Sequence, residues 1–155
     1  RLVSDVIPTE FCCLHAPLNS KIGLVGKQYN VSSAPIRVLD SQTFLVPSFS
    51  FRGSLPPDGW FFAGSGKIER GIGRKALIQG RDRLGHHCAM HEDYVSEDVV
   101  VRLAGDQTVY DISFLSVFCY DFDVDFGHVN LDLNPKSHPL PAFIPPIGYS
   151  PPEIE

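Results

Sequence analysis

The sequence has little of what helical, basic or membrane-spanning proteins need. It contains one Met and one Trp in 155 residues, and no stretch of about ten residues repeats apolar side chains at helical spacing. There is no basic run, and 13 Lys and Arg against 18 Asp and Glu give a net charge of −5. Nucleic acid and anionic membranes are therefore excluded as main partners. No apolar run approaches the roughly 20 residues of a membrane helix, so direct membrane insertion is not expected.

Short apolar runs separated by turn residues make up most of the chain. Glycine and proline number 13 each and aromatic residues make up 11%, a composition typical of strands and turns. The runs predict nine strands, at 22–25, 36–39, 43–46, 48–51, 60–63, 76–78, 98–103, 112–119 and 124–131. This pattern predicts an all-β fold, namely an antiparallel β-sandwich or barrel of about 8 to 10 short strands without long helices.

Strand alternation also predicts which side chains form the core and where the domain ends. Because alternate residues of a strand share one face, one core is expected from Trp60, Phe62, Val99, Val101, Leu103, Leu115, Val117, Phe122 and Phe126. Prolines are concentrated near the C-terminus, which is typical of an extended segment. The expected organisation is an N-terminal segment (1–21) with Cys12 and Cys13, a β domain (22–133), and a proline-rich extended tail (134–155).

Cysteine usage indicates the compartment. The four cysteines are Cys12, Cys13, Cys88 and Cys119, and they form no C-x-x-C pair of a zinc ribbon or thioredoxin-type site. Their even number favours a disulfide-braced secreted domain, in which Cys12 and Cys13 reach separately to the other two. Asn30 begins a glycosylation sequon. The first residue is not Met and no apolar leader follows, as expected after removal of a signal peptide. We expect a secreted protein or the ectodomain of a cell-surface protein.

One cluster of potential soft-metal ligands lies in a polar segment. His86, His87 and His91 flank Cys88, and imidazoles with a thiolate can bind a soft divalent metal. The alternative is a solvated loop whose histidines make pH-dependent surface contacts.

A second cluster is acidic. Asp121, Asp123 and Asp125 alternate with apolar residues, so on a strand they would share one face. Three neighbouring carboxylates repel one another unless calcium or a basic side chain lies among them. The alternative is a solvated acidic face.

No catalytic constellation is recognisable. The glycines at 71–73 lack the strand and helix of a dinucleotide site, and residues 64–67 lack the first glycine and the Ser or Thr of a phosphate loop. No Gly-x-Ser-x-Gly elbow is present. We do not expect hydrolytic activity. Cys119 ends an apolar run, so we expect it to be at least partly buried, either in a structural disulfide or as a redox thiol.

The last predicted strands resemble a known family. The segment Thr108-Val109-Tyr110-Asp111-Ile112-Ser113-Phe114-Leu115-Ser116-Val117-Phe118-Cys119 resembles the signature of the DM-thirteen domain family. In that family the stretch reads Thr, two residues, Asp-Ile, one residue, Trp-Leu-Ser-Val-Trp-Cys. Here Phe114 and Phe118 stand at the two tryptophan positions. Blocks at 38–43, 49–53, 57–64 and 126–129 also resemble the family, with Arg52 where an aspartate is common.

The resemblance implies a fold and two functions. The family is the Skeletor-type extracellular all-β module, often coupled to DOMON domains, which bind haem or sugar, and to membrane cytochromes. It implies a part in electron transfer that oxidises cell-surface proteins, with Cys119 as the redox residue. The leading hypothesis is a secreted binding, adhesion or matrix module without its own catalysis and without a cofactor. The alternative is a redox domain using Cys119 beside a haem-containing partner. An extracellular protein, a matrix component or another domain of a larger protein is the expected partner.

Overall fold

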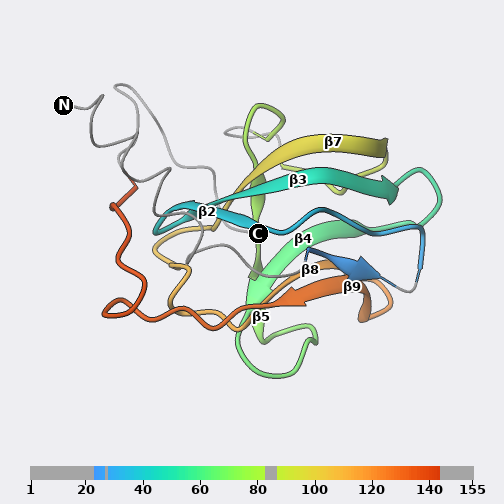
Figure 1. Cartoon of the computed structure of the whole chain (residues 1–155). Coiled ribbons are helices and arrows are strands. Elements are labelled where there is room, and N and C mark those ends of the chain that lie inside the picture. The colour runs from blue at the N-terminus through green and yellow to red at the C-terminus, as the bar shows by residue number, and fades with distance from the viewer. Residues whose placement is uncertain (1–22, 27, 83–86, 144–155) are drawn as a thin grey trace.

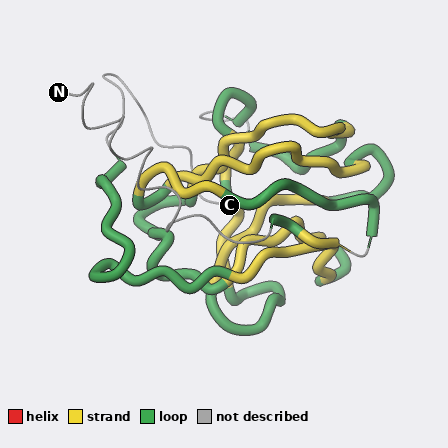
Figure 2. The backbone as a smooth tube through the Cα atoms, in the orientation of Figure 1, coloured by secondary structure: helices red, strands yellow, loops and turns green. Residues whose placement is uncertain are grey.

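Two stacked antiparallel sheets form the protein. The computed structural model describes residues 23–26, 28–82 and 87–143, which contain nine strands and no helix (Figure 2). Figure 1 shows β2, β3 and β7 in one layer and β4, β8 and β9 in the other. The predicted all-β sandwich is confirmed, whereas the alternative of a closed barrel is wrong, because both sheets have open edges. In the described part of the chain, no helix is long and apolar enough to cross a membrane.

The larger sheet has five strands. Their order is β1 (Val25–Gly26), β9 (Val124–Asn130), β8 (Phe114–Cys119), β4 (Gly59–Gly64) and β5 (Gly73–Lys75). The central strands β4 and β8 are buried along their whole length, as their continuous apolar sequences require. The short β5 was not predicted, because its glycine was interpreted as part of a turn.

The smaller sheet has four strands. Their order is β2 (Arg37–Asp40), β3 (Thr43–Arg52), β7 (Asp93–Arg102) and β6 (Leu77–Ile78). The runs predicted as two strands at 43–46 and 48–51 form the single strand β3, which continues past Pro47 through a register shift. Ser48 lies at this shift with a φ of 51°, and Ser96 on β7 has the same φ. A β-bulge thus allows the strand to accommodate a proline.

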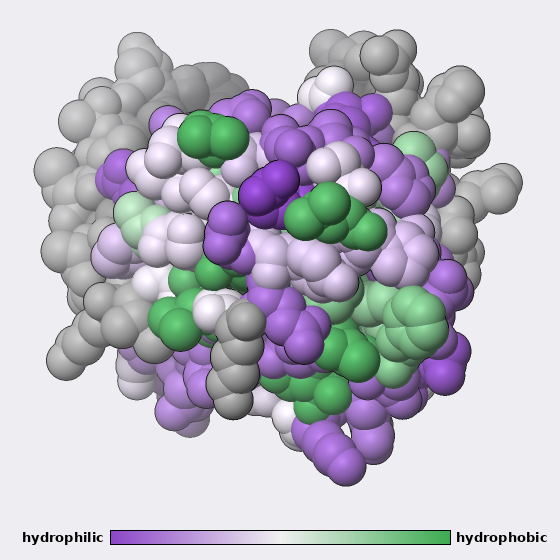
Figure 3. All heavy atoms as spheres, turned by 90° about the vertical axis from the view of Figure 1, so that its right-hand side faces the viewer, coloured by the Kyte–Doolittle hydropathy of each residue, from purple (hydrophilic) through white to green (hydrophobic). Residues whose placement is uncertain are grey.

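One edge of this sheet is only partly covered. Among the described residues, β6 pairs with only Val101 and Arg102 of β7, so the first residues of β7 have a partner strand on one side alone. Val95 on this edge is 77% exposed. On the face drawn in Figure 3, apolar residues lie in small groups between hydrophilic ones.

The core lies between the two sheets and is mostly as predicted. Six of the expected residues belong to it, namely Val99, Val101, Leu103, Leu115, Val117 and Phe126. Phe122 does not, because it lies in the turn between β8 and β9 and is 68% exposed. The prediction for Phe122 was wrong because the strand phase does not continue through this turn.

A second, smaller cluster covers the outer face of the five-stranded sheet. It is formed by Phe62, Phe114 and Phe118, with Phe62 and Phe118 stacked at 4.6 Å between ring centroids. Trp60 shares this face, because it lies opposite Phe118 and two residues from Phe62. Placing Trp60 and Phe62 in the main core was therefore wrong. β4 is apolar on both faces, so alternation cannot show which face points inward.

The chain after β9 lies against the domain as far as residue 143. The Tyr110 hydroxyl donates to the His138 carbonyl at 2.6 Å, and the Ser41 amide donates to the Pro141 carbonyl at 2.9 Å. Leu133 and Leu140 pack against the main core. The predicted division of the chain at residues 21 and 133 stays a prediction.

Candidate functional site

Strand alternation places Cys119 inside the core. Leu115, Val117 and Cys119 are alternate residues of β8 and belong to the core between the sheets. Cys119 is 0% exposed and lies opposite Gly59 of β4 and Val124 of β9. A Cβ at Gly59 would lie 2.9 Å from the Phe51 ring, so the glycine leaves room for that ring beside the thiol's strand. Cys119 is a free thiol.

Cys88 is a second free thiol, but it is exposed. It lies between β6 and β7, and Nη2 of Arg81 is 3.8 Å from its Sγ. The same guanidinium donates to the carbonyls of Cys88 and Ala89 at 3.0 and 2.8 Å. Arg81 therefore fixes the backbone on which the thiol stands.

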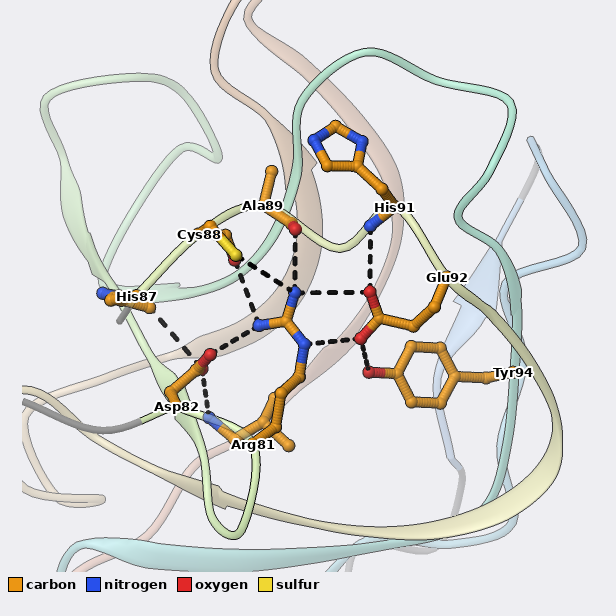
Figure 4. A network of polar contacts seen from close by, with 9 residues as sticks. Arg81, Asp82, His87, Cys88, Ala89, His91, Glu92 and Tyr94 are labelled. Carbon is orange, nitrogen blue, oxygen red and sulfur yellow. Dashed lines mark hydrogen bonds and ion pairs between the residues drawn. The ribbon is translucent and has the colours of Figure 1, made fainter. Parts of the chain in front are cut away.

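Arg81 is the centre of a polar network, as Figure 4 shows. Its Nε lies 2.5 Å from Glu92 Oε2, and its Nη1 lies 2.5 Å from Asp82 Oδ1. The Tyr94 hydroxyl donates to Glu92 Oε2 at 2.6 Å. The Asp82 side chain is only 3% exposed and also accepts the Ile78 amide at 2.7 Å. One cation thus holds two carboxylates, one of them buried.

The network shifts the protonation of its members. Partial burial opposes the charge on Glu92, but the hydrogen bonds from Arg81 and Tyr94 outweigh it, so the pKa of Glu92 is lowered. Burial and the hydrogen bond to Glu92 raise the pKa of Tyr94. Burial opposes the charge on Arg81, but Glu92 and Asp82 together raise its pKa. Within the network, Glu92 and Arg81 are therefore charged and Tyr94 is neutral near neutral pH.

A further polar cluster lies on the outer face of the five-stranded sheet. Asp125 Oδ1 accepts the buried Ser116 hydroxyl at 2.7 Å and the Gly127 amide at 3.0 Å. Asp125 Oδ2 lies 2.6 Å from His128 Nδ1. Sequence reasoning missed this cluster, because residues three apart on a regular strand do not share a face. The isolated glycine at 127 is the signal that indicates the irregularity.

Comparison with known proteins identifies the family. The sequence model of a family described as "Electron transfer DM13" matches residues 24–131, most of the chain. The chain belongs to the DM13 family. Two curated relatives are the Skeletor proteins of Drosophila melanogaster, isoforms B/C and isoforms D/E, each 34% identical over 138 residues. The match covers 89% of this chain but only 16% and 9% of those proteins. No solved structure matches the chain significantly.

The acidic residues of this DM13 domain do not share a strand face as expected. Asp121 and Asp123 lie in the turn before β9, and only Asp125 lies on the strand. The Asp123 side chain accepts the Arg70 amide at 2.8 Å, and the Asp121 amide donates to Asp58 at 3.1 Å. The predicted common face was wrong because the turn interrupts the strand alternation.

The histidines near Cys88 point in different directions. His87 is 6% exposed, lies edge-on to Trp60 at 5.0 Å between centroids, and has Nε2 3.9 Å from Asp82. The His91 ring points away from Arg81 (Figure 4). His86 lies outside the described residues. No group of three or more metal-ligating side chains occurs in the part of the DM13 domain that the structure describes.

The remaining predicted sites concern secretion. Asn30 is exposed and has a φ of 59°, in the loop between β1 and β2. Cys12 and Cys13 lie outside the described residues, and Cys88 and Cys119 are not bridged to each other. Disulfide bracing of this DM13 domain therefore stays a prediction.

Proposed function

We propose that this chain is the electron-transfer domain of a larger extracellular protein and that Cys119 is its redox group. The observation that supports the proposal is a free thiol at the position of the family signature's cysteine, in a chain that belongs to a family described by electron transfer. Among the described residues no second cysteine is bridged to it.

Burial limits how Cys119 reacts. Thiol–disulfide exchange requires a thiolate that reaches the partner sulfur, and Cys119 is 0% exposed. Two routes remain: exchange of a single electron in the folded domain, or exposure of the thiol by local opening. In the first route the thiol loses one electron and one proton and becomes a thiyl radical; the electron passes to a one-electron acceptor such as the haem iron of a partner, and the proton passes to water. In the second, a thiol–disulfide exchange follows the opening.

The test is voltammetry of the full chain immobilised on an electrode. We expect a redox wave that is retained in Cys88→Ser and lost in Cys119→Ala, with circular dichroism showing that both variants fold. Trapping with oxidised glutathione and mass spectrometry separates the two routes, because only exposure by opening gives a glutathione adduct at residue 119. A parent protein without a wave and without an adduct at residue 119 would refute the redox role.

The second candidate function is a binding module without catalysis. Complete burial of Cys119 supports it, because a buried thiol is usually inert. In that case Cys119→Ala would change only the stability of the fold.

The glycosylation sequon at Asn30 supports the proposal that the protein is secreted. An exposed Asn in a loop, in an N-x-S sequence, is a suitable acceptor for an N-linked glycan. Expression through a eukaryotic secretory pathway should give a glycosidase-sensitive mass increase, which Asn30→Gln abolishes. An unmodified secreted parent protein would contradict glycosylation at this site.

A further inference from the structure

A β-bulge brings Asp125 and His128 to the same side of the sheet. Val117 of β8 faces Gly127, but Phe118 faces Asp125, so Phe126 is an extra residue on β9. Asp125 and His128 are three residues apart and would point to opposite faces of a regular strand. The extra residue changes this phase, and both side chains lie on the outer face, beside Ser116. Bulges commonly re-aim side chains in this way at functional sites.

The three hydrogen bonds of Asp125 determine what His128 presents. The carboxylate accepts from the Ser116 hydroxyl, the Gly127 amide and His128 Nδ1, so its oxygens are well satisfied. A carboxylate 2.6 Å from Nδ1 keeps the proton on that nitrogen. When the ring carries a single proton, Nε2 therefore keeps its lone pair and can accept a hydrogen bond. The ring is 36% exposed, and within the described chain Nε2 has no hydrogen-bond partner.

A groove lies beside this imidazole. It has a volume of about 400 Å³ and is lined by residues 125–130 of β9 and by Val25 of β1. Val25 is 63% exposed, and among the described residues β1 pairs with β9 opposite Gly127 and His128 alone. The groove therefore combines an apolar wall, an exposed imidazole and the exposed side chain of Asn130. Grooves of this size suit small molecules.

We propose that this groove binds a neutral, planar hydroxyaromatic molecule, of the phenol class, whose hydroxyl donates a hydrogen bond to His128 Nε2. The acceptor on the imidazole requires a ligand with a donor. The Asp125 carboxylate disfavours anionic ligands, because it lies next to the imidazole. Val25 provides a contact for an aromatic ring, and the Asn130 amide offers a further polar contact. The site does not depend on a redox role of Cys119, which lies on the inner face of the same sheet.

The test compares two probes with the same ring, one whose oxygen carries a proton and one whose oxygen carries a methyl group instead. 4-Methylphenol is titrated into the ¹⁵N-labelled full chain, followed by amide and imidazole ¹⁵N NMR shifts, and 4-methylanisole is titrated in parallel. We expect saturable shifts at Val25, Gly127, His128 and Asn130, with a change at His128 Nε2. The anisole lacks the hydroxyl proton and cannot donate this hydrogen bond. It should therefore bind about tenfold more weakly, because the net contribution of one hydrogen bond corresponds to about that change in affinity.

Variants locate the contact. His128→Phe keeps a ring but removes Nε2 and should weaken 4-methylphenol binding to the level of the anisole. His91→Phe is the matched control, since its ring points away from the described polar network, and should leave binding unchanged. Equal affinity of the two probes for the parent protein would overturn the proposal, and that comparison needs no variant to fold. Unchanged binding in a folded His128→Phe, or shifts that do not saturate, would also overturn it.

Discussion

Cys119 and Cys88 are both free thiols, but different features of the sequence place them. The apolar run of β8 buries Cys119 by alternation, with uncharged neighbours on both paired strands. Cys88 lies between β6 and β7 and belongs to neither strand, and the charged side chain of Arg81 determines its surroundings. In this domain, the position of Cys119 on an apolar strand buries its thiol. The thiol of Cys88 is exposed, and the polar network around Arg81 holds its backbone.

Alkylation should give the largest difference between the two thiols. Cys88 is exposed and should react with iodoacetamide at the rate of a free thiol, whereas Cys119 should react only after local opening. If opening of the core costs about 4 kcal/mol or more, the rates differ by roughly 10³-fold or more. Mass spectrometry of the native protein against time measures both rates. Comparable rates would show that the end of β8 opens readily.

Removing the cation of the network should be the next largest effect. Arg81→Met leaves the Asp82 carboxylate, whose side chain is 3% exposed, without its charged partner. Loss of one partner of a buried ion pair typically costs about 3–5 kcal/mol in the free energy of unfolding. Urea unfolding measures this, with Arg74→Met as a control because the Arg74–Asp106 pair is exposed. A cost below about 1 kcal/mol would show that the network is not structural.

A polar replacement of the buried thiol should cost less. Cys119→Ser places a hydroxyl in the core, where leaving it unpaired costs about 1–3 kcal/mol. Cys88→Ser should change the free energy of unfolding by less than about 0.5 kcal/mol, because the site is exposed. Chemical denaturation of the two variants compares them directly. Equal effects would contradict the assigned burial.

Acidification should reduce the contribution of the network near Cys88. Because the folded-state pKa of Glu92 is lowered, its stabilisation is present above its ordinary pKa of 4.5 and is lost as the pH falls through the lower folded value. The difference in unfolding free energy between the parent protein and Glu92→Gln should therefore be constant near neutral pH and shrink below about pH 4.5. Denaturation at several pH values measures it. If the difference between the parent protein and Glu92→Gln grows on acidification, the lowered pKa of Glu92 is contradicted.

The smallest effect is expected in the turn that follows Cys119. Phe122 is 68% exposed, so Phe122→Ser should change the free energy of unfolding by less than about 0.5 kcal/mol. Phe126→Ala, in the core four residues later, should cost about 3–5 kcal/mol. Thermal and urea unfolding compare the pair. A large decrease in the free energy of unfolding of Phe122→Ser would show that Phe122 packs in the core.

The sequence predicted where strands form better than it predicted which side chains point into the core. The expected core positions of Leu115 and Val117 are confirmed, although β8 is apolar on both faces apart from Ser116. Alternation failed at Trp60 and Phe62, because a strand that is apolar on both faces carries no phase information. Cys119 was identified as the end of an apolar run, and the family resemblance added the electron-transfer role to it.

The polar sites were not predictable from local patterns. Arg81 and Glu92 meet across eleven positions of sequence, and nothing in either neighbourhood specifies the other. Asp125 and His128 meet only because a bulge changes the strand phase. The predicted acidic face failed for a related reason, since the turn that contains Asp121 and Asp123 interrupts the alternation.

The edge of β7, which the described residues cover only in part, affects how copies of the domain associate. An unpaired strand edge is a template on which other chains can add, and it promotes aggregation when it is flat and apolar. Here Ser48 and Ser96, both with a φ of 51°, distort the strand pair, and Glu97 lies opposite the buried Phe49. A charge and a twist at this position disfavour the addition of a further strand. The same irregularity that admits Pro47 thus works against the addition of a further strand at this edge.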